Sequence, residues 1–151
     1  MASTGTRKDY AQFQSITTRW MDNDVYGHVN NVTYYSWFDT AVNRYLIEEG
    51  QLDIHRSPVI AYVVSSSCHY FKPVAYPQTI EAGLRVNRLG NSSVRYGVGI
   101  FRAGEDEPCA EGEFIHVFVD RESERSCPIP EPVRAALTRL LPAENGVTER
   151  S

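Results

Sequence analysis

The chain has 151 residues, of which 42% are apolar and 23% charged, and its formal net charge is −4. Such a composition is typical of one globular domain with a hydrophobic core. The negative charge argues against general nucleic-acid binding. No apolar run approaches the roughly 20 residues that a membrane span requires.

The cysteines and the first residues indicate the compartment. Cys68, Cys109 and Cys127 are odd in number and form no CxxC pair, which favours reduced thiols over a disulfide framework. Residues 1–9 lack the apolar segment of a secretory signal. We therefore expect a cytoplasmic protein with a single domain over residues 1–151. Its core should span about residues 10–141, with disordered tails at residues 1–8 and 143–151.

The first half of the chain predicts a strand, a polar loop and a long helix. Residues 10–20 suit a strand, and residues 22–31 (DNDVYGHVNN) form the loop. Residues 32–50 have the apolar spacing of one helical face, with Asn30 or Asn31 as N-cap and Gly50 as the stop. The apolar positions are Val32, Tyr35, Phe38, Ala41, Val42, Tyr45 and Leu46, widened by Tyr34 and Trp37.

The second half predicts strands at residues 59–71, 79–89, 93–102 and 110–120, and then a short helix at 132–141. In the last strand, Phe114, His116 and Phe118 share one face. Short turns favour an antiparallel meander of these four strands, with the long helix covering one face. The other face still carries aromatic and β-branched residues, which predicts a second copy of the chain as partner.

Charge is unevenly distributed along the predicted strands. Residues 82–104 contain four arginines and no acidic residue. Such a stretch is suited to a small polyanion, for example a phosphate-bearing cofactor. Equally, these arginines suit outward-facing positions on solvated strands.

The polar loop is the richest candidate for chemistry. Asp22, Asp24 and His28 lie just before the helix start, where free backbone N–H groups and a partial positive charge are expected. A carboxylate beside such donors can attack a carbonyl whose oxyanion the donors stabilise. The alternative for Asp24 is an Asx turn or helix-capping role, and for Asp22 we expect only a turn or salt bridge. Hydrolytic metal sites usually need three well-spaced ligands, so we predict no metal site.

Residues 24–31 (DVYGHVNN) and Tyr34, together with the order of elements, resemble the hotdog-fold thioesterases, in particular the 4-hydroxybenzoyl-CoA thioesterase-like branch. The resemblance is sharp over residues 19–38 and elsewhere rests on the order of elements. It implies an α+β hotdog fold, in which a five-stranded antiparallel sheet wraps around one long central helix. Members of this family dimerise into a ten-stranded sheet, and many form tetramers, so the resemblance implies a homodimer or homotetramer.

The resemblance also implies an activity, the hydrolysis of acyl-CoA to free acid and CoA. Asp24 would be the nucleophile or the general base, and backbone N–H groups near Asn31 would form the oxyanion hole. His28 would assist catalysis or tie the loop to the helix, and Tyr34 would border the acyl tunnel or belong to the core. No cofactor is implied, since CoA is part of the substrate. The candidates for holding its pantetheine arm and phosphates are Arg88, Asn91, Ser92 and Ser93.

Two other functions remain open on the same fold. One is hydrolysis of acyl-carrier-protein thioesters, which needs a basic surface for the acidic carrier. The other is acyl-CoA binding without turnover, against which the intact Asp24 argues.

Overall fold

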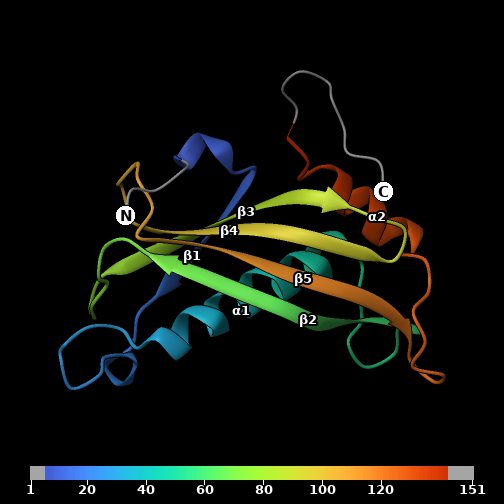
Figure 1. Ribbon diagram of the computed structural model, residues 1–151, viewed down its shortest axis with the longest axis horizontal. Helices are drawn as coiled ribbons and strands as arrows, with labels where there is room; N and C mark the ends of the chain where they lie inside the picture. Colours follow the sequence, from blue (N-terminus) through green and yellow to red (C-terminus); the bar gives the residue numbers. More distant parts are fainter. Residues whose placement is uncertain (1–5, 143–151) are drawn as a thin grey trace.

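One long helix lies against one face of a five-stranded antiparallel sheet (Figure 1). The computed structural model describes residues 6–142. Single turns of 3-10 helix lie at Arg7–Asp9 and Trp20–Asp22. The other elements, in chain order, are β1 (Gln12–Thr17), α1 (Asn31–Glu49), β2 (Val59–Tyr70), β3 (Thr79–Leu89), β4 (Ser93–Arg102), β5 (Ala110–Asp120) and α2 (Glu131–Thr138).

The five-stranded sheet and its central helix confirm the predicted fold class, but the predicted four-strand meander is wrong. The strand order is β1-β3-β4-β5-β2, so that β2 pairs with β5 and not with β3. The connection over residues 71–78 is too long for a tight hairpin and contains Pro73 and Pro77. It carries the chain across one end of the sheet, and therefore leaves β1 and β2 as the two edge strands.

Helix α1 is held to the sheet by one apolar face. Asn30 is the N-cap, and its side chain accepts a hydrogen bond from the Val32 backbone N–H at 2.9 Å. Val32 was expected in the core and is 75% exposed. It lies two residues before Tyr34, roughly 200° around the helix from the buried face. That face consists of Tyr34, Trp37, Phe38, Ala41, Val42, Tyr45 and Leu46.

The alternation of the strands places the core between the sheet and α1. Phe114, His116 and Phe118 are buried on the helix side of β5, as the sequence predicts. The helix side of β4 contributes Val94, Tyr96, Val98 and Ile100. The short helix α2 adds Val133, Ala136 and Leu137 to the same cluster.

The N-terminal segment is more ordered than predicted. The Arg7 guanidinium lies over the rings of Phe13 and Phe101, and its Nη1 forms an ion pair with Glu81 at 2.6 Å. The expected disorder is therefore wrong for residues 6–8. The rest of the predicted tails, residues 1–5 and 143–151, lies outside the described residues.

Edge strand β2 differs from the other strands in its exposure. Most of its side chains are exposed, including Tyr62, Val63, Val64 and Tyr70. Among residues 6–142, no helix is both long enough and apolar enough to cross a membrane.

Candidate active site

The loop between β1 and α1 folds back on itself as a small hairpin. Asn23 and Val29 form an isolated antiparallel bridge, and the Asp24 N–H donates to the His28 carbonyl at 2.8 Å. At its base, Asp22 is almost fully buried and pairs with Arg19 at 2.8 Å. The salt-bridge role expected for Asp22 is therefore confirmed.

The tip of this loop orients the Asp24 carboxylate. Oδ1 of Asp24 accepts the backbone N–H of Tyr26 at 2.8 Å, and the Asp24 carbonyl accepts the N–H of Gly27 at 3.0 Å. Gly27 has a φ of 83°, a conformation that glycine adopts without steric cost. Asp24 thus forms an Asx turn through one oxygen, and no hydrogen bond within residues 6–142 involves its second oxygen, Oδ2.

The start of α1 leaves one backbone donor available. The Asn30 N–H donates to the Asp22 carbonyl, and the Val32 N–H donates to the Asn30 side chain. Within the described chain, the N–H of Asn31 has no acceptor. Of the backbone N–H groups of Asn30, Asn31 and Val32, only that of Asn31 is therefore free to meet a ligand.

The connection between β2 and β3 forms the opposite wall. It is fastened to the loop at two points: the Val29 N–H donates to the Val74 carbonyl at 2.7 Å, and the Tyr76 N–H donates to Oδ1 of Asn23 at 3.0 Å. Arg102 donates to the Pro73 carbonyl at 2.7 Å from the sheet side. These contacts hold two segments that are far apart in sequence against each other.

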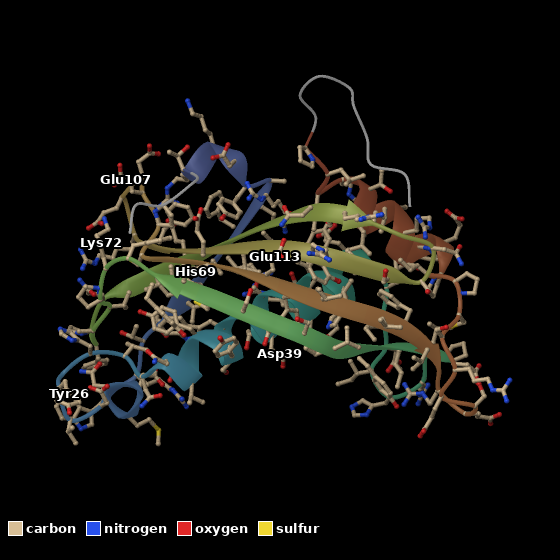
Figure 2. All side chains as sticks on the ribbon, in the orientation of Figure 1. Tyr26, Asp39, His69, Lys72, Glu107 and Glu113 are labelled. Atoms are coloured by element: carbon tan, nitrogen blue, oxygen red, sulfur yellow. The ribbon has the colours of Figure 1, made fainter. Side chains whose placement is uncertain are left out.

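Between these walls lies a cavity of about 420 Å³. Its lining includes four of the predicted site residues, Asp24, His28, Asn31 and Tyr34. Figure 2 shows Tyr26 and Lys72, which also line it, at the end of the sheet where α1 begins. The structure therefore brings the catalytic candidates and Tyr34 together at one cavity.

Aromatic rings form the floor of this cavity. The rings of Tyr34 and Tyr70 meet edge to face with centroids 5.0 Å apart, and Tyr34 also contacts Trp37. Burial raises the pKa of both tyrosine hydroxyls, so they are neutral at physiological pH. Aromatic rings in the same cavity as a carboxylate and a free N–H suit an acyl group whose carbonyl meets those polar groups.

His28 is exposed at the cavity rim. Within residues 6–142, its imidazole forms no hydrogen bond to the Asp24 carboxylate. The structure thus brings the two side chains to one cavity without coupling them directly.

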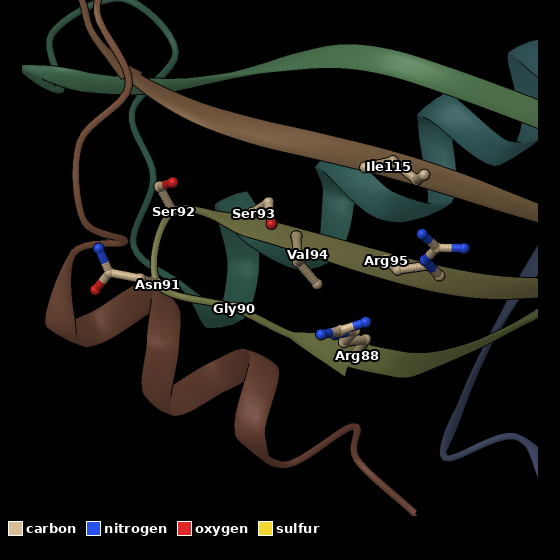
Figure 3. A pocket seen from close by; sticks show the side chains of 8 residues that line it. All are labelled: Arg88, Gly90, Asn91, Ser92, Ser93, Val94, Arg95 and Ile115. Carbon is tan, nitrogen blue, oxygen red and sulfur yellow. The ribbon is translucent and has the colours of Figure 1, made fainter. Parts of the chain in front are cut away.

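The remaining predicted residues lie elsewhere. Arg88, Asn91, Ser92 and Ser93 line a second cavity of about 300 Å³ at the β3–β4 turn, shown in Figure 3. Tyr70, at the first cavity, pairs with Ala110, whereas Ser93 pairs with Val117. Seven residue steps along β5 correspond to roughly 23 Å. One chain therefore holds the two groups at opposite ends of its sheet (Figure 1).

Sequence reasoning missed the cavity wall. Tyr70, Phe71, Lys72 and Pro73 follow the loop by more than 40 residues, and only the fold places them beside it. Tyr26 could have been predicted to line the site from the sequence, since it is an aromatic residue at the tip of a polar turn. In the described chain, no three His, Cys, Asp or Glu side chains are grouped for a metal ion, and the three cysteines are free thiols.

Comparisons with known proteins agree with this architecture. The PA5185 protein of Pseudomonas aeruginosa is 60% identical, with a TM-score of 0.90 over 92% of this chain and 97% of its own. The PA2801 protein of the same species is 31% identical, with a TM-score of 0.76 over 84% and 98%. A 1,4-dihydroxy-2-naphthoyl-CoA thioesterase from Synechocystis is 17% identical and shares the fold, with a TM-score of 0.75 over 83% and 94%.

The family model of the thioesterase-like superfamily matches residues 18–137. This span runs from the end of β1 into α2 and includes both cavities. The chain belongs to the thioesterase-like superfamily.

Proposed function

We propose that this protein is an acyl-CoA thioesterase that uses Asp24 as its acting carboxylate. The observation that carries the proposal is the one cavity lined by Asp24, by Asn31 with its free N–H, and by the packed rings of Tyr34 and Tyr70. The superfamily supports thioester hydrolysis, and the name of the Synechocystis structure supports a CoA thioester.

In the proposed reaction, the thioester carbonyl oxygen points at the Asn31 N–H and its carbon faces Asp24. As a general base, Asp24 accepts a proton from water while the water oxygen attacks the carbonyl carbon. As a nucleophile, Asp24 forms a mixed anhydride that water then hydrolyses. In both routes the C–S bond breaks, the thiolate leaves as CoA and takes up a proton, and the acyl group leaves as the acid. His28, at the rim, is suited to orienting water.

The phosphates of CoA are assigned to Arg88, Asn91, Ser92 and Ser93. Since these residues lie at the far end of the same sheet, one chain presents the two parts of the site too far apart. A two-fold dimer that pairs β2 with its copy antiparallel reverses the partner's sheet, so that its β3–β4 turn lies toward the Asp24 end. The proposed enzyme is therefore a homodimer, or a tetramer built from such dimers, with each site shared between two chains.

The decisive test is Asp24→Asn, assayed by thiol release over short, long and aryl acyl-CoAs. Asparagine keeps the oxygen that accepts the Tyr26 N–H, so the turn is retained. We expect kcat to fall by about a hundredfold to ten-thousandfold, because the base or nucleophile is lost. The matched control is Asp39→Asn, which makes the same change at an exposed carboxylate on α1 outside the cavity lining and should keep kcat within about twofold.

Several outcomes would contradict the proposal. A folded Asp24→Asn protein with the wild-type rate would exclude Asp24 as the acting group. Tight binding of acyl-CoA by the wild-type protein without any thiol release would indicate a binding protein. A kcat/KM that is much higher for acyl-carrier-protein thioesters than for CoA thioesters would reassign the natural substrate.

A further inference from the structure

The backbone carbonyl groups of the β3–β4 turn accept hydrogen bonds on the side that faces away from the cavity. Nη2 of Arg134, on α2, donates to the Gly90 carbonyl at 2.6 Å and to the Asn91 carbonyl at 3.1 Å. The Ile129 N–H also donates to Asn91, and the Phe118 N–H donates to the Ser92 carbonyl at 2.8 Å. Three successive carbonyl oxygens are thus directed into the protein and away from the cavity.

The hydrogen-bond donors of the same turn remain free. Within residues 6–142, the backbone N–H groups of Asn91 and Ser92 and the hydroxyls of Ser92 and Ser93 have no acceptor. The cavity that they line, about 300 Å³ in volume, also contains Arg88 and Arg95, which are cross-strand neighbours (Figure 3).

The two arginines differ in their partners. Arg95 forms an ion pair with Glu113 at 3.2 Å, whereas Arg88 has no acidic partner in the described chain. Consecutive N–H groups beside an unpaired guanidinium form an arrangement that binds phosphate oxygens. A carbonyl oxygen turned toward the same space would repel them.

We propose that Arg134 is a positioning residue for a phosphate site at this turn: by bonding the Gly90 and Asn91 carbonyls, it keeps the donors of Asn91 and Ser92 directed at a phosphate of the CoA nucleotide. The inference rests on the proposed function. Arg134 touches neither the acyl group nor the reacting atoms, and it acts through the turn. The competing interpretation is that Arg134 merely fastens α2 to the sheet.

A kinetic comparison of two substrates separates these interpretations. One is an acyl-CoA, and the other is the N-acetylcysteamine thioester of the same acid, which has no nucleotide. Arg134→Met keeps the aliphatic stem and removes the donors. We expect the KM for acyl-CoA to rise about tenfold or more, with kcat unchanged within about twofold and the N-acetylcysteamine thioester unaffected. Arg134→Lys keeps a cationic donor and should restore most of the affinity.

The matched control is Arg139→Met at the C-cap of α2, where the arginine pairs with Glu49 at 3.3 Å and lies outside the turn. This variant should behave as the wild type with both substrates. An equal loss with both substrates in Arg134→Met would reduce Arg134 to a structural tie and overturn the inference. The same conclusion would follow if Arg134→Lys failed to recover the KM.

Binding of adenosine 3′,5′-bisphosphate, measured by calorimetry, tests the phosphate site without turnover. We expect the wild type to bind this nucleotide about tenfold more tightly than Arg134→Met does. Equal affinities would overturn the inference even if thioesters are hydrolysed. Conversely, a wild-type protein that binds the nucleotide in this way but hydrolyses no thioester would contradict the proposed function and leave the phosphate site supported.

Discussion

Asp22 and Asp24 show how two carboxylates two residues apart acquire different roles. Asp22 is only 3% exposed, and its oxygens accept hydrogen bonds from the backbone and the guanidinium of Arg19. Asp24 uses one oxygen to shape its turn, and its carboxylate lines the cavity. A carboxylate saturated by such donors is a poor base or nucleophile. The hydrogen-bond partners therefore favour Asp24 as the acting residue.

His116 is a residue whose burial has a consequence for stability. Its ring is 1% exposed, lies among the rings of Tyr96, Phe114 and Phe118, and receives one polar contact, at 3.3 Å from the Tyr96 hydroxyl to Nδ1. Burial lowers the pKa of His116 to about 4. The imidazole is therefore neutral in the folded protein at neutral pH.

The shifted pKa predicts a loss of stability in mild acid. An unfolded histidine titrates near 6.5, so protons bind the unfolded state first. Above about pH 6.5 the titration of His116 does not lower the free energy of unfolding. As the pH falls from there to about 4, the free energy of unfolding decreases by a total of at most about 3 kcal/mol. When urea unfolding is measured across this pH range, the free energy of unfolding should decline more steeply for the wild type than for His116→Phe.

Two results would contradict this prediction. One is an identical pH dependence of the unfolding free energy in the wild type and in His116→Phe. The other is an NMR titration of the wild-type His116 ring with a midpoint near pH 6.5, which needs no variant and is therefore independent of whether His116→Phe folds.

At the scale of elements, the cavity is the junction of two connections. The β1–α1 loop contributes Asp24, and the β2–β3 connection contributes the wall from Tyr70 to Pro73. Asn23 links them, since its side-chain oxygen accepts the Tyr76 N–H at 3.0 Å. One of the two hydrogen bonds that fasten the wall to the Asp24 loop therefore comes from a side chain that itself does not line the cavity.

This link predicts an effect of Asn23→Ala on activity beyond its effect on stability. Losing one hydrogen bond should cost about 1 kcal/mol and lower the melting temperature by roughly 3 °C. Because one of the two hydrogen bonds that fasten the wall to the Asp24 loop is then lost, the wall is held less firmly, and kcat/KM should fall by about tenfold. Asn23→Asp keeps an acceptor oxygen and serves as the control. If Asn23→Ala retains the wild-type kcat/KM at a temperature where it is folded, Asn23 has no positioning role.

The sequence predicted the bounds of the strands much better than it predicted which strands pair with each other. The bounds of β3, β4 and β5 follow from side-chain alternation, which is a local property of each strand. The partner of β2 depends on how the connection 71–78 crosses the sheet, and no local pattern encodes it. The same limit applies to the site: Asp24, His28 and Asn31 lie in one short motif, whereas the wall from Tyr70 to Pro73 joins them only through tertiary contacts.

At the scale of the whole molecule, β2 is an apolar edge strand with a free backbone ladder. Tyr62, Val63 and Val64 are 43%, 46% and 58% exposed. A long exposed edge of this kind pairs with another strand unless charge, proline or a covering element prevents it. Strand β2 contains no Asp, Glu, Lys or Arg residue. The edge is therefore suited to pairing with a second copy.

Val64 tests this pairing, because it lies in the irregularity between Val63 and Ser65 and has no partner residue on β5. A lysine there places a charge at the edge and disfavours pairing with the copy. We expect the wild type to have twice the mass of one chain in light scattering, or four times that mass if such dimers pair, and Val64→Lys the mass of one chain. In the proposed shared site the partner supplies the phosphate contacts, so kcat/KM for acyl-CoA should fall by about tenfold or more in the monomer.

Val64→Thr is the matched control, since threonine keeps the β-branched shape without charge and should retain both the dimer mass and the activity. A wild-type protein that has the mass of one chain and is fully active would contradict the shared site. So would a monomeric Val64→Lys with the wild-type KM for acyl-CoA, because one chain would then suffice to bind the nucleotide. A dimeric Val64→Lys would instead place the interface on a surface other than β2, and the roughly 23 Å between the two cavities would have to be bridged by a different symmetry.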